Sequence, residues 1–469
     1  MEHRADRKST TSRIARALPA LRGRPENIPT IVGVVVVAIG GGAAAAFTGL
    51  GAVLMVGGAL LVLFLAANRR YLAISLVLAM FVTRPVAEIG PASVRPEIVV
   101  GAAALVSVLG DIVQRRRIPR FQLNLFTAVY LWIAYLAVIS MLHSVDVAES
   151  ISTLAWMAMC ATAAFWISVN PDFTGLIVRS AVWVNFAVAL SAIFLYGLSN
   201  ISGYGIGAQF DPAYGGYAVY VLSIEANILG GLVCIWSVIC IADPLRQFSS
   251  RLRIAMLFIA PVAILATHTR GALAAFVLAL VILGITRGRI IASAAFVAVV
   301  SWIGLTIATH HDPGLAKFAT GLDFSGGTEI VRYTSWKVAW SDISSSAENF
   351  VFGSGFNSYG QRHLDPTVPD ITRPSYLGNL PLQLLYDGGI ITLLVVSMVV
   401  FAVWWRAGRA IGFGVATAIS VAYMTISIGT SVLWLMETWM LVGLAAANCR
   451  RGDSRRKSGN ESPGRKAAA

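Results

Sequence analysis

Residues 380–405 read LPLQLLYDGGIITLLVVSMVVFAVWW, an apolar run with a single charged side chain, Asp387. The run exceeds the length of about 20 residues that a helix needs to cross a bilayer. It also lacks the alternation of apolar and polar residues that is typical of membrane strands. Because lipid cannot satisfy backbone polar groups, such a run must form a transmembrane helix.

Similar apolar runs fill most of the chain, which is 57% hydrophobic and has a mean hydropathy of +0.73. Only 13% of its residues are charged, whereas a soluble domain has about 25%. The sequence predicts an all-α integral membrane protein with about 12–14 transmembrane helices and one large outer-face loop. The expected spans are 29–47, 50–67, 71–86, 96–113, 122–142, 150–169, 175–198, 217–241, 252–267, 271–286, 290–309, 380–405, 411–428 and 431–448.

Positive charge is concentrated in both tails and in short turns between the runs, and the formal net charge is +13. Examples of such turns are Arg115-Arg116-Arg117 and Arg287-Gly288-Arg289. The positive-inside rule places clusters of this kind in the cytoplasm, which predicts that both termini are cytoplasmic. Topology and contact with anionic membrane lipids account for the charge, so the sequence argues against nucleic-acid binding.

The spans and their connections divide the chain into five regions. We expect a basic cytoplasmic tail at 1–28, an N-terminal transmembrane bundle at 29–309, a large extracytoplasmic loop with an amphipathic helix at 310–379, C-terminal transmembrane helices at 380–448, and a second basic tail at 449–469. The composition of both tails predicts disorder. Long loops in compact proteins are usually functional or disordered, and the aromatic patterning of 310–379 favours function.

Arg270 stands at the outer end of one span, directly before Gly271 and a new apolar run. An arginine at membrane depth is costly unless it meets an anion or a water-filled cavity. It either reaches the lipid headgroups or binds an anionic substrate, and its planar fork suits a diphosphate.

The loop contains a second cation, Arg332, beside residues with helical periodicity. Tyr333, Trp336, Trp340 and Ile343 recur at steps of three and four, which predicts an amphipathic helix at the membrane interface. This helix is either a lid that only packs, or a substrate site in which Arg332 binds an anion and the aromatic faces bind sugar rings.

Candidates for proton transfer are few. His363 is the loop histidine away from the membrane edge, and its ordinary pKa suits a general base at neutral pH, although a loop histidine can simply be solvated. The rival carboxylates are Asp365, Asp370 and Asp387. The stretch Phe352-Gly353-Ser354-Gly355-Phe356 predicts a turn rather than a nucleotide cradle. The four cysteines lack metal-ligand spacing, so we expect no metal and no cofactor.

The order of three motifs resembles the O-antigen ligase and polymerase family of polytopic bacterial membrane glycosyltransferases. The motifs are Thr269-Arg270-Gly271-Ala272, then Arg332 and Trp336 with the glycine turn at 352–356, then Asn379-Leu380 with Tyr386-Asp387-Gly388-Gly389. The resemblance covers about residues 215–400. It implies metal-independent glycosyl transfer at the outer face of the cytoplasmic (inner) membrane.

The same resemblance implies the substrates. The donor would be a polyprenyl-diphosphate-linked glycan, the acceptor a second glycan or a lipid, and a chain-length regulator is a possible partner. Arg270 and Arg332 would contact the diphosphate. The remaining substrate-binding candidates are Trp336, Trp340, Arg373 and Asn379.

One position departs from the family pattern. Ligases of the family carry His-Asn where this chain has Gly378-Asn379. His363 or a carboxylate could replace the histidine, leaving-group stabilisation could suffice, or the chain could be polymerase-like, which we favour. The alternatives are a lipid-linked oligosaccharide flippase or other transporter, and an inactive scaffold. A flippase should carry charged or polar residues inside many spans, along a translocation path. Here the middle positions of the spans are almost free of charged residues, and Glu225 and Glu437 are the exceptions.

Overall fold

A computed structural model describes most of the hydrophobic part of the chain. The described residues are 50–84, 87–89, 92–114, 118–211, 216–288, 327–363, 377–431 and 433–447. The predicted spans 29–47 and 290–309, both tails and Arg373 lie outside them. The chain forms two compact units, Met1–Arg69 and Arg70–Ala469. In the first unit, helix α3 (Leu50–Ala67) is followed by Asn68, whose side chain donates to the Phe64 carbonyl at 2.8 Å.

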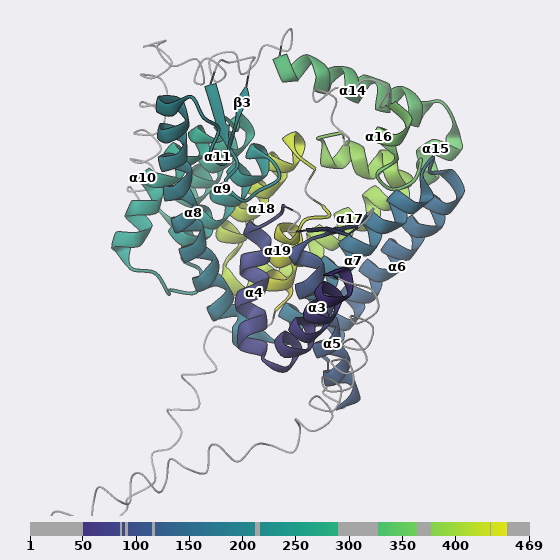
Figure 1. Cartoon of the computed structure of the whole chain (residues 1–469), viewed down its shortest axis with the longest axis horizontal. Helices are drawn as coiled ribbons and strands as arrows, with labels where there is room; N and C mark the ends of the chain where they lie inside the picture. Colours follow the sequence, from purple (N-terminus) through teal and green to yellow (C-terminus); the bar gives the residue numbers. More distant parts are fainter. Residues whose placement is uncertain are drawn as a thin grey trace, which may run out of the picture. The chain divides into compact units, whose positions relative to one another are not determined.

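Helices make up nearly all of the rest, which confirms the predicted all-α class (Figure 1). They are α4 (Arg69–Phe81), α5 (Pro96–Val113), α6 (Arg120–His143), α7 (Val147–Val169), η3 (Pro171–Phe173), α8 (Thr174–Ser202), α9 (Ala226–Ala242), α10 (Ser250–Ala266), α11 (Arg270–Arg287), α14 (Gly327–Ser344), α15 (Ala347–Phe352), α16 (Ser358–His363), α17 (Leu380–Ile411), α18 (Phe413–Gly429) and α19 (Met436–Ala446).

Two small antiparallel hairpins interrupt the helices, and the sequence did not predict them. β1 (Ala87–Ile89) pairs with β2 (Ala92–Val94), and β3 (Ala208–Asp211) pairs with β4 (Gly216–Val219). The predicted span 217–241 therefore begins as a strand. Its helical part, α9, starts only at Ala226, because residues 216–219 bond to the preceding strand instead.

Among the described residues, five helices are long and apolar enough to cross a membrane. They are α5, α6, α7, α17 and the continuous stretch Pro171–Ser202, and the number rises to six if Gly57–Ala67 and Arg69–Phe81 form one broken span. α9, α11, α18 and α19 are shorter apolar helices. α9 is buried along almost its whole length, so it packs inside the bundle rather than facing lipid. The chain is an integral membrane protein.

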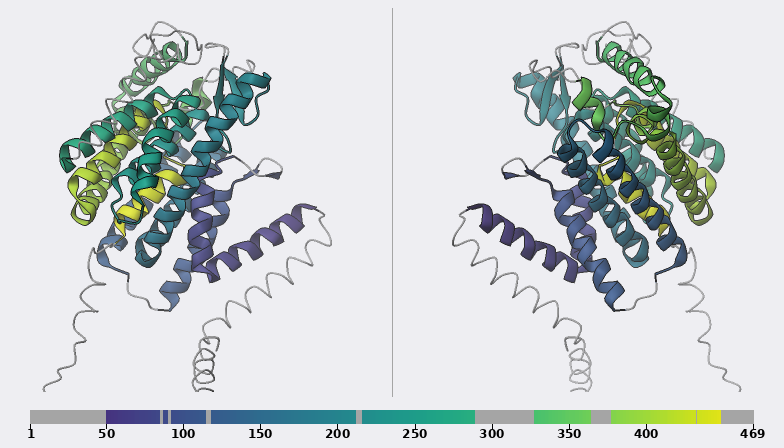
Figure 2. Two further views of the ribbon diagram at one scale, coloured as in Figure 1. Left: turned by 90° about the vertical axis from the view of Figure 1, so that its left-hand side faces the viewer. Right: turned by 90° about the vertical axis from the view of Figure 1, so that its right-hand side faces the viewer.

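Helices α11 and α18 lie side by side (Figure 2). A Cβ atom at Gly414, near the start of α18, would lie 2.4 Å from Thr286 Oγ1, near the end of α11. The two helices are therefore antiparallel, and the end of α18 lies beside the start of α11. A Cβ atom at Gly230 of α9 would lie 2.7 Å from Thr267 Oγ1, which brings the start of α9 to the same end of the bundle.

The described part of the predicted outer loop at 310–379 also reaches this end, since a Cβ atom at Gly429, at the end of α18, would lie 3.6 Å from Arg332 Nη1. The turn after α6 bonds to α16, where the Asp146 amide donates to Gln361 Oε1 at 2.9 Å. Arg84 Nε, before β1, donates to the Ser223 carbonyl, before α9, at 3.0 Å. At the opposite end, Arg406 Nε donates to the Ala446 carbonyl at 3.0 Å. The bundle thus has two distinct ends, and the assignment of the first end to the outer face stays a prediction.

Candidate functional site

The glycine turn at 352–356 packs against a break in helix α17. The Ser354 amide donates to the Tyr386 carbonyl at 2.7 Å, and the Gly355 amide donates to the Asp387 carbonyl at 3.0 Å. These carbonyls are available because α17 leaves helical geometry at Gly388 and Gly389. Two motifs that lie apart in the sequence therefore form a single backbone interlock, which we call the glycine interlock (residues 353–355 and 386–389).

Close approach explains why glycines occupy these positions. Gly389 has φ +66°, and a Cβ atom there would lie 2.1 Å from the Val351 carbonyl oxygen. Gly353 has φ +83°, and its Cβ would lie 2.5 Å from the Gly388 amide nitrogen. L-residues with side chains rarely adopt such angles. The interlock fixes the loop on the bundle and so determines where α14 and α16 lie.

Asp387 lies beneath the interlock and is only 2% exposed. Its carboxylate accepts from Gln383 Nε2 at 3.2 Å and from the backbone amide of Asn357. Buried carboxylates need such partners. The structure thus places this sequence candidate where it holds the loop to α17 rather than where it meets solvent.

Arg332 and Asn379 come together at the end of α18. A Cβ atom at Gly429 would lie 3.6 Å from Arg332 Nη1, and one at Gly378 would lie 3.6 Å from the Gly429 carbonyl oxygen. Arg270 starts α11 at this same end of the antiparallel pair. We call this region the cation end (Arg270, Arg332, Gly378, Asn379 and Gly429).

The first turn of α17 adds to the positive potential of the cation end. Asn379 is the N-cap, and its Oδ1 accepts from the Leu382 amide at 3.1 Å. The amides at a helix N-terminus carry partial positive charge and favour anions. A helix N-terminus and two arginines at one end of the bundle are suited to an anionic group such as a phosphate.

Trp336 connects helix α14 to the cation end. Its Nε1 donates to the Leu377 carbonyl at 3.0 Å, and Ala339 and Ile343 on the same face are buried against α17. Tyr333 and Trp340 are 46% and 54% exposed. Ile343 is buried and Trp336 partly buried, whereas Tyr333 and Trp340 are the exposed aromatic residues of the helix. The predicted position of this helix at the membrane interface stays a prediction.

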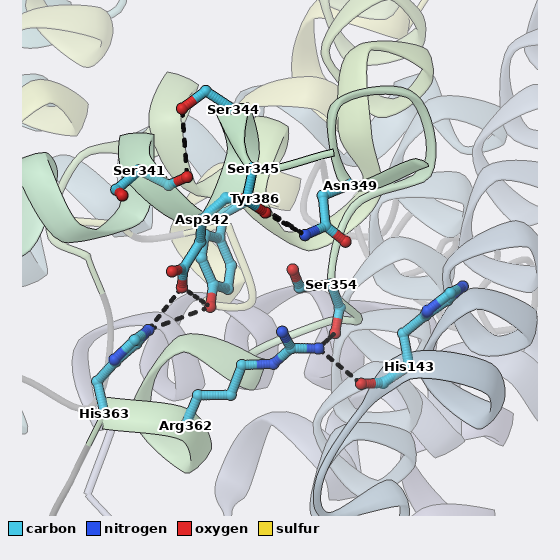
Figure 3. A network of polar contacts seen from close by, with 10 residues as sticks. All are labelled: His143, Ser341, Asp342, Ser344, Ser345, Asn349, Ser354, Arg362, His363 and Tyr386. Carbon is cyan, nitrogen blue, oxygen red and sulfur yellow. Dashed lines mark hydrogen bonds and ion pairs between the residues drawn. The ribbon is translucent and has the colours of Figure 1, made fainter. Parts of the chain in front are cut away.

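A polar cluster joins the other end of α14 to α16 and α17 (Figure 3). His363 Nε2 lies 2.7 Å from Asp342 Oδ2, and the Tyr386 hydroxyl donates to the same oxygen at 3.0 Å. Sequence reasoning identified His363 but missed Asp342 and gave Tyr386 no role. His363 and Tyr386 are separated from Asp342 by 21 and 44 positions, and no spacing rule could have paired the three residues.

Arg362 anchors this cluster to the turn after α6. Its Nη2 donates to the His143 carbonyl at 2.9 Å and to the Ser354 carbonyl at 3.4 Å (Figure 3). Helix α16 is thus bonded both to the glycine interlock and to the bundle, which holds His363 in a defined position.

An apolar groove of about 480 Å³ lies along α17. Its lining starts at Leu380 and Pro381, directly after Asn379 of the cation end, and continues to Ala407 and Ile411 at the far end of α17. Its few polar side chains are Thr174, Ser397, Ser420, Tyr423 and Thr438. The groove therefore runs along α17 through the thickness of the bundle and suits a long apolar chain.

Within the part of the chain that the structure describes, no group of three His, Cys, Asp or Glu side chains could hold a metal ion. Residues 255–397 match the family model described as O-antigen ligase. The match confirms the family resemblance over the segment that contains Arg270, Arg332, Trp336, His363 and Asn379. No curated protein matches the chain.

Proposed function

We propose that this protein, whose residues 255–397 match the O-antigen ligase family, transfers glycan from a polyprenyl-diphosphate carrier during cell-surface polysaccharide biosynthesis. The observation that supports this most is that the lining of the apolar groove starts directly after Asn379 of the cation end. One ligand with an anionic diphosphate head and a long hydrocarbon tail would occupy both features.

The chemistry of the leaving group fits the cation end. An acceptor hydroxyl attacks the anomeric carbon, the bond from that carbon to the diphosphate oxygen breaks, and its electron pair leaves with the diphosphate. Arg270, Arg332 and the N-terminus of α17 would stabilise the developing charge at a site beside lipid, where electrostatic stabilisation is strong. Trp336 and Asn379 would contact the sugar next to the diphosphate.

The hydroxyl proton needs an acceptor, and the two sequence candidates differ in access. The side chain of His363 is 30% exposed, whereas Asp387 is buried and bonded to the loop. We therefore assign proton transfer to His363 and a positioning role to Asp387. Arg373 and Trp340 stay candidates for contacts with more distant sugars.

The topology of the positive charges supports an outer-face reaction. With both termini cytoplasmic, as the basic tails predict, the cation end faces outward, away from the nucleotide-sugar pool. A lipid-linked acceptor glycan would make the protein a polymerase, which we favour over a ligase. A separate chain-length regulator stays a prediction from the family resemblance.

Substitution of the two arginines tests the proposal. The protein in nanodiscs receives polyprenyl-diphosphate-linked glycans extracted from membranes of cells that lack it, and release of polyprenyl diphosphate is measured. We expect Arg270→Ala and Arg332→Ala each to lower the rate by about 10²-fold. Arg409→Ala, an exposed arginine in the last turn of α17 at the opposite end, is the matched control and should leave the rate unchanged.

Two outcomes would count against the proposal. A folded Arg270→Ala, Arg332→Ala double variant with the wild-type rate would exclude the cation end as the diphosphate site. Movement of intact lipid-linked glycan across the membrane without release of polyprenyl diphosphate would support the transporter alternative instead.

A further inference from the structure

We propose that Asp342 is the positioning residue that makes His363 the general base of this transfer, with Tyr386 fixing the Asp342 carboxylate. This inference rests on the proposed function. It supplies a proton acceptor for a chain that has Gly378 where ligases of the family carry histidine. It assigns roles to Asp342, which no sequence motif contains, and to Tyr386, to which the motif at 386–389 gave no role.

The geometry of the cluster is that of an oriented imidazole. His363 Nε2 and the Tyr386 hydroxyl converge on one carboxylate oxygen of Asp342, at 2.7 Å and 3.0 Å (Figure 3). The ring of Tyr359 lies 4.8 Å from the His363 ring and 5.5 Å from the Tyr386 ring, centroid to centroid. Three elements, α14, α16 and α17, thus hold the imidazole.

The hydrogen bonds define which ring nitrogen can act. An ionised carboxylate only accepts hydrogen bonds, so Nε2 of neutral His363 carries the hydrogen and Nδ1 carries the lone pair. Nδ1 takes the proton of the acceptor hydroxyl while the oxygen bonds to the anomeric carbon and the diphosphate leaves. Asp342 keeps its charge throughout and stabilises the imidazolium, the role that the buried aspartate has in hydrolase triads.

The cluster lies within reach of the cation end. Trp336, which bonds to Leu377, precedes Asp342 by six residues, or about 9 Å of helix axis. Arg332 lies on the other side of Trp336. Helix α14 therefore presents, in order, a cation for the diphosphate, an aromatic ring for the sugar, and the oriented base.

A structural role alone does not account for this arrangement. Asp342 and His363 are about equally accessible, with side chains 29% and 30% exposed, and pairs at such positions add little stability. Charged and titratable groups of the described residues near the pair include Arg362 and Tyr359 from α16, and Tyr386 and Asp387 from α17.

The test is the pH dependence of polyprenyl diphosphate release in the nanodisc assay. His363→Ala should lower the rate by about 10²–10⁴-fold. Asp342→Asn keeps the shape of the side chain but removes the charge that favours imidazolium. The rate should therefore fall at least about tenfold, and the acid limb of the pH–rate profile should move to lower pH. Tyr386→Phe removes a donor and leaves more charge on Asp342, so its acid limb should move to higher pH.

Two comparisons separate this role from general damage. Asp342→Asn should have almost no further effect in the His363→Ala background, because both changes disable one unit. Glu348→Gln alters another exposed carboxylate near a histidine, 3.8 Å from His143 Nε2, and should change neither rate nor profile.

The inference is overturned if Asp342→Asn and Tyr386→Phe keep the wild-type pH profile, or if Asp342→Asn costs as much without His363 as with it. If Asp342→Asn does not fold, the position of the acid limb in Tyr386→Phe tests the inference by itself, and an acid limb at the wild-type pH overturns it. If Arg332→Ala loses activity while Asp342→Asn keeps the wild-type pH–rate profile, this inference is contradicted but the proposed function is still supported.

Discussion

Replacement of Gly378 by histidine restores the residue that family ligases carry before Asn379, and its outcome can be worked out from the backbone. Gly378 has φ +63°, a left-handed conformation that costs an L-residue about 1–2 kcal/mol. Histidine is among the residues enriched there, so we take the lower value. Among the described residues, a Cβ atom would meet only the Gly429 carbonyl oxygen, at 3.6 Å, which is an ordinary contact. Gly378→His should therefore fold.

The functional gain appears when His363 is absent. The new imidazole would lie at the cation end, beside the predicted position of the anomeric carbon. A general base contributes about 10²–10⁴-fold, so we expect Gly378→His to raise the rate of the His363→Ala variant by at least about tenfold. In the presence of His363 it should add little, because one base already serves the hydroxyl.

The assay is polyprenyl diphosphate release from the extracted donor, with thermal unfolding measured on the same nanodiscs. Gly378→Asn is the control, since asparagine tolerates the left-handed conformation but cannot take the proton. A stable Gly378→His, His363→Ala protein that is no faster than His363→Ala would refute the reasoning, because the two positions would not serve the same reacting atoms.

Further predictions concern the glycine interlock and the groove. Gly389→Ala places a Cβ atom 2.1 Å from the Val351 carbonyl oxygen at φ +66° and should destabilise the protein by about 3 kcal/mol or more in thermal unfolding. Gly110→Ala, whose Cβ has no atom of the described residues within 4 Å, should be neutral or slightly stabilising. An unfolding midpoint of Gly389→Ala equal to wild type would rule out the interlock. Ser420→Trp fills the apolar groove and should weaken binding of a long polyprenyl diphosphate but not of a two-isoprene analogue, and Leu394→Trp on the exposed side of α17 should weaken neither.

Much of the helical architecture could be predicted from hydrophobic runs. The expected segments 50–67 and 96–113 coincide with α3 and α5. The run 217–241 shows the limit, because its first residues are apolar enough for a helix yet pair with 208–211 as a strand. Short apolar stretches do not distinguish the two.

Residues of the candidate site could be chosen from the sequence one by one, but their arrangement could not. Arg270, Arg332 and Asn379 were chosen from motifs, whereas their placement at one end of the bundle depends on the antiparallel packing of α11 and α18. The glycine turn at 352–356 was predicted, but its partner in the broken helix α17 was not. Asp342 and Tyr386 join His363 only through tertiary packing, which no local pattern encodes.

Photo-crosslinking tests the central claim, that one lipid diphosphate occupies the cation end and the groove together. A polyprenyl diphosphate with a diazirine in a middle isoprene unit is bound to the wild-type protein in nanodiscs, irradiated, and the labelled peptides are mapped by mass spectrometry. The account predicts labels on groove-lining residues such as Val396 and Ser420, and loss of these labels in the Arg270→Ala, Arg332→Ala variant. Labels confined to the exposed residues Leu394 and Met398, and unaffected by the arginine substitutions, would contradict it.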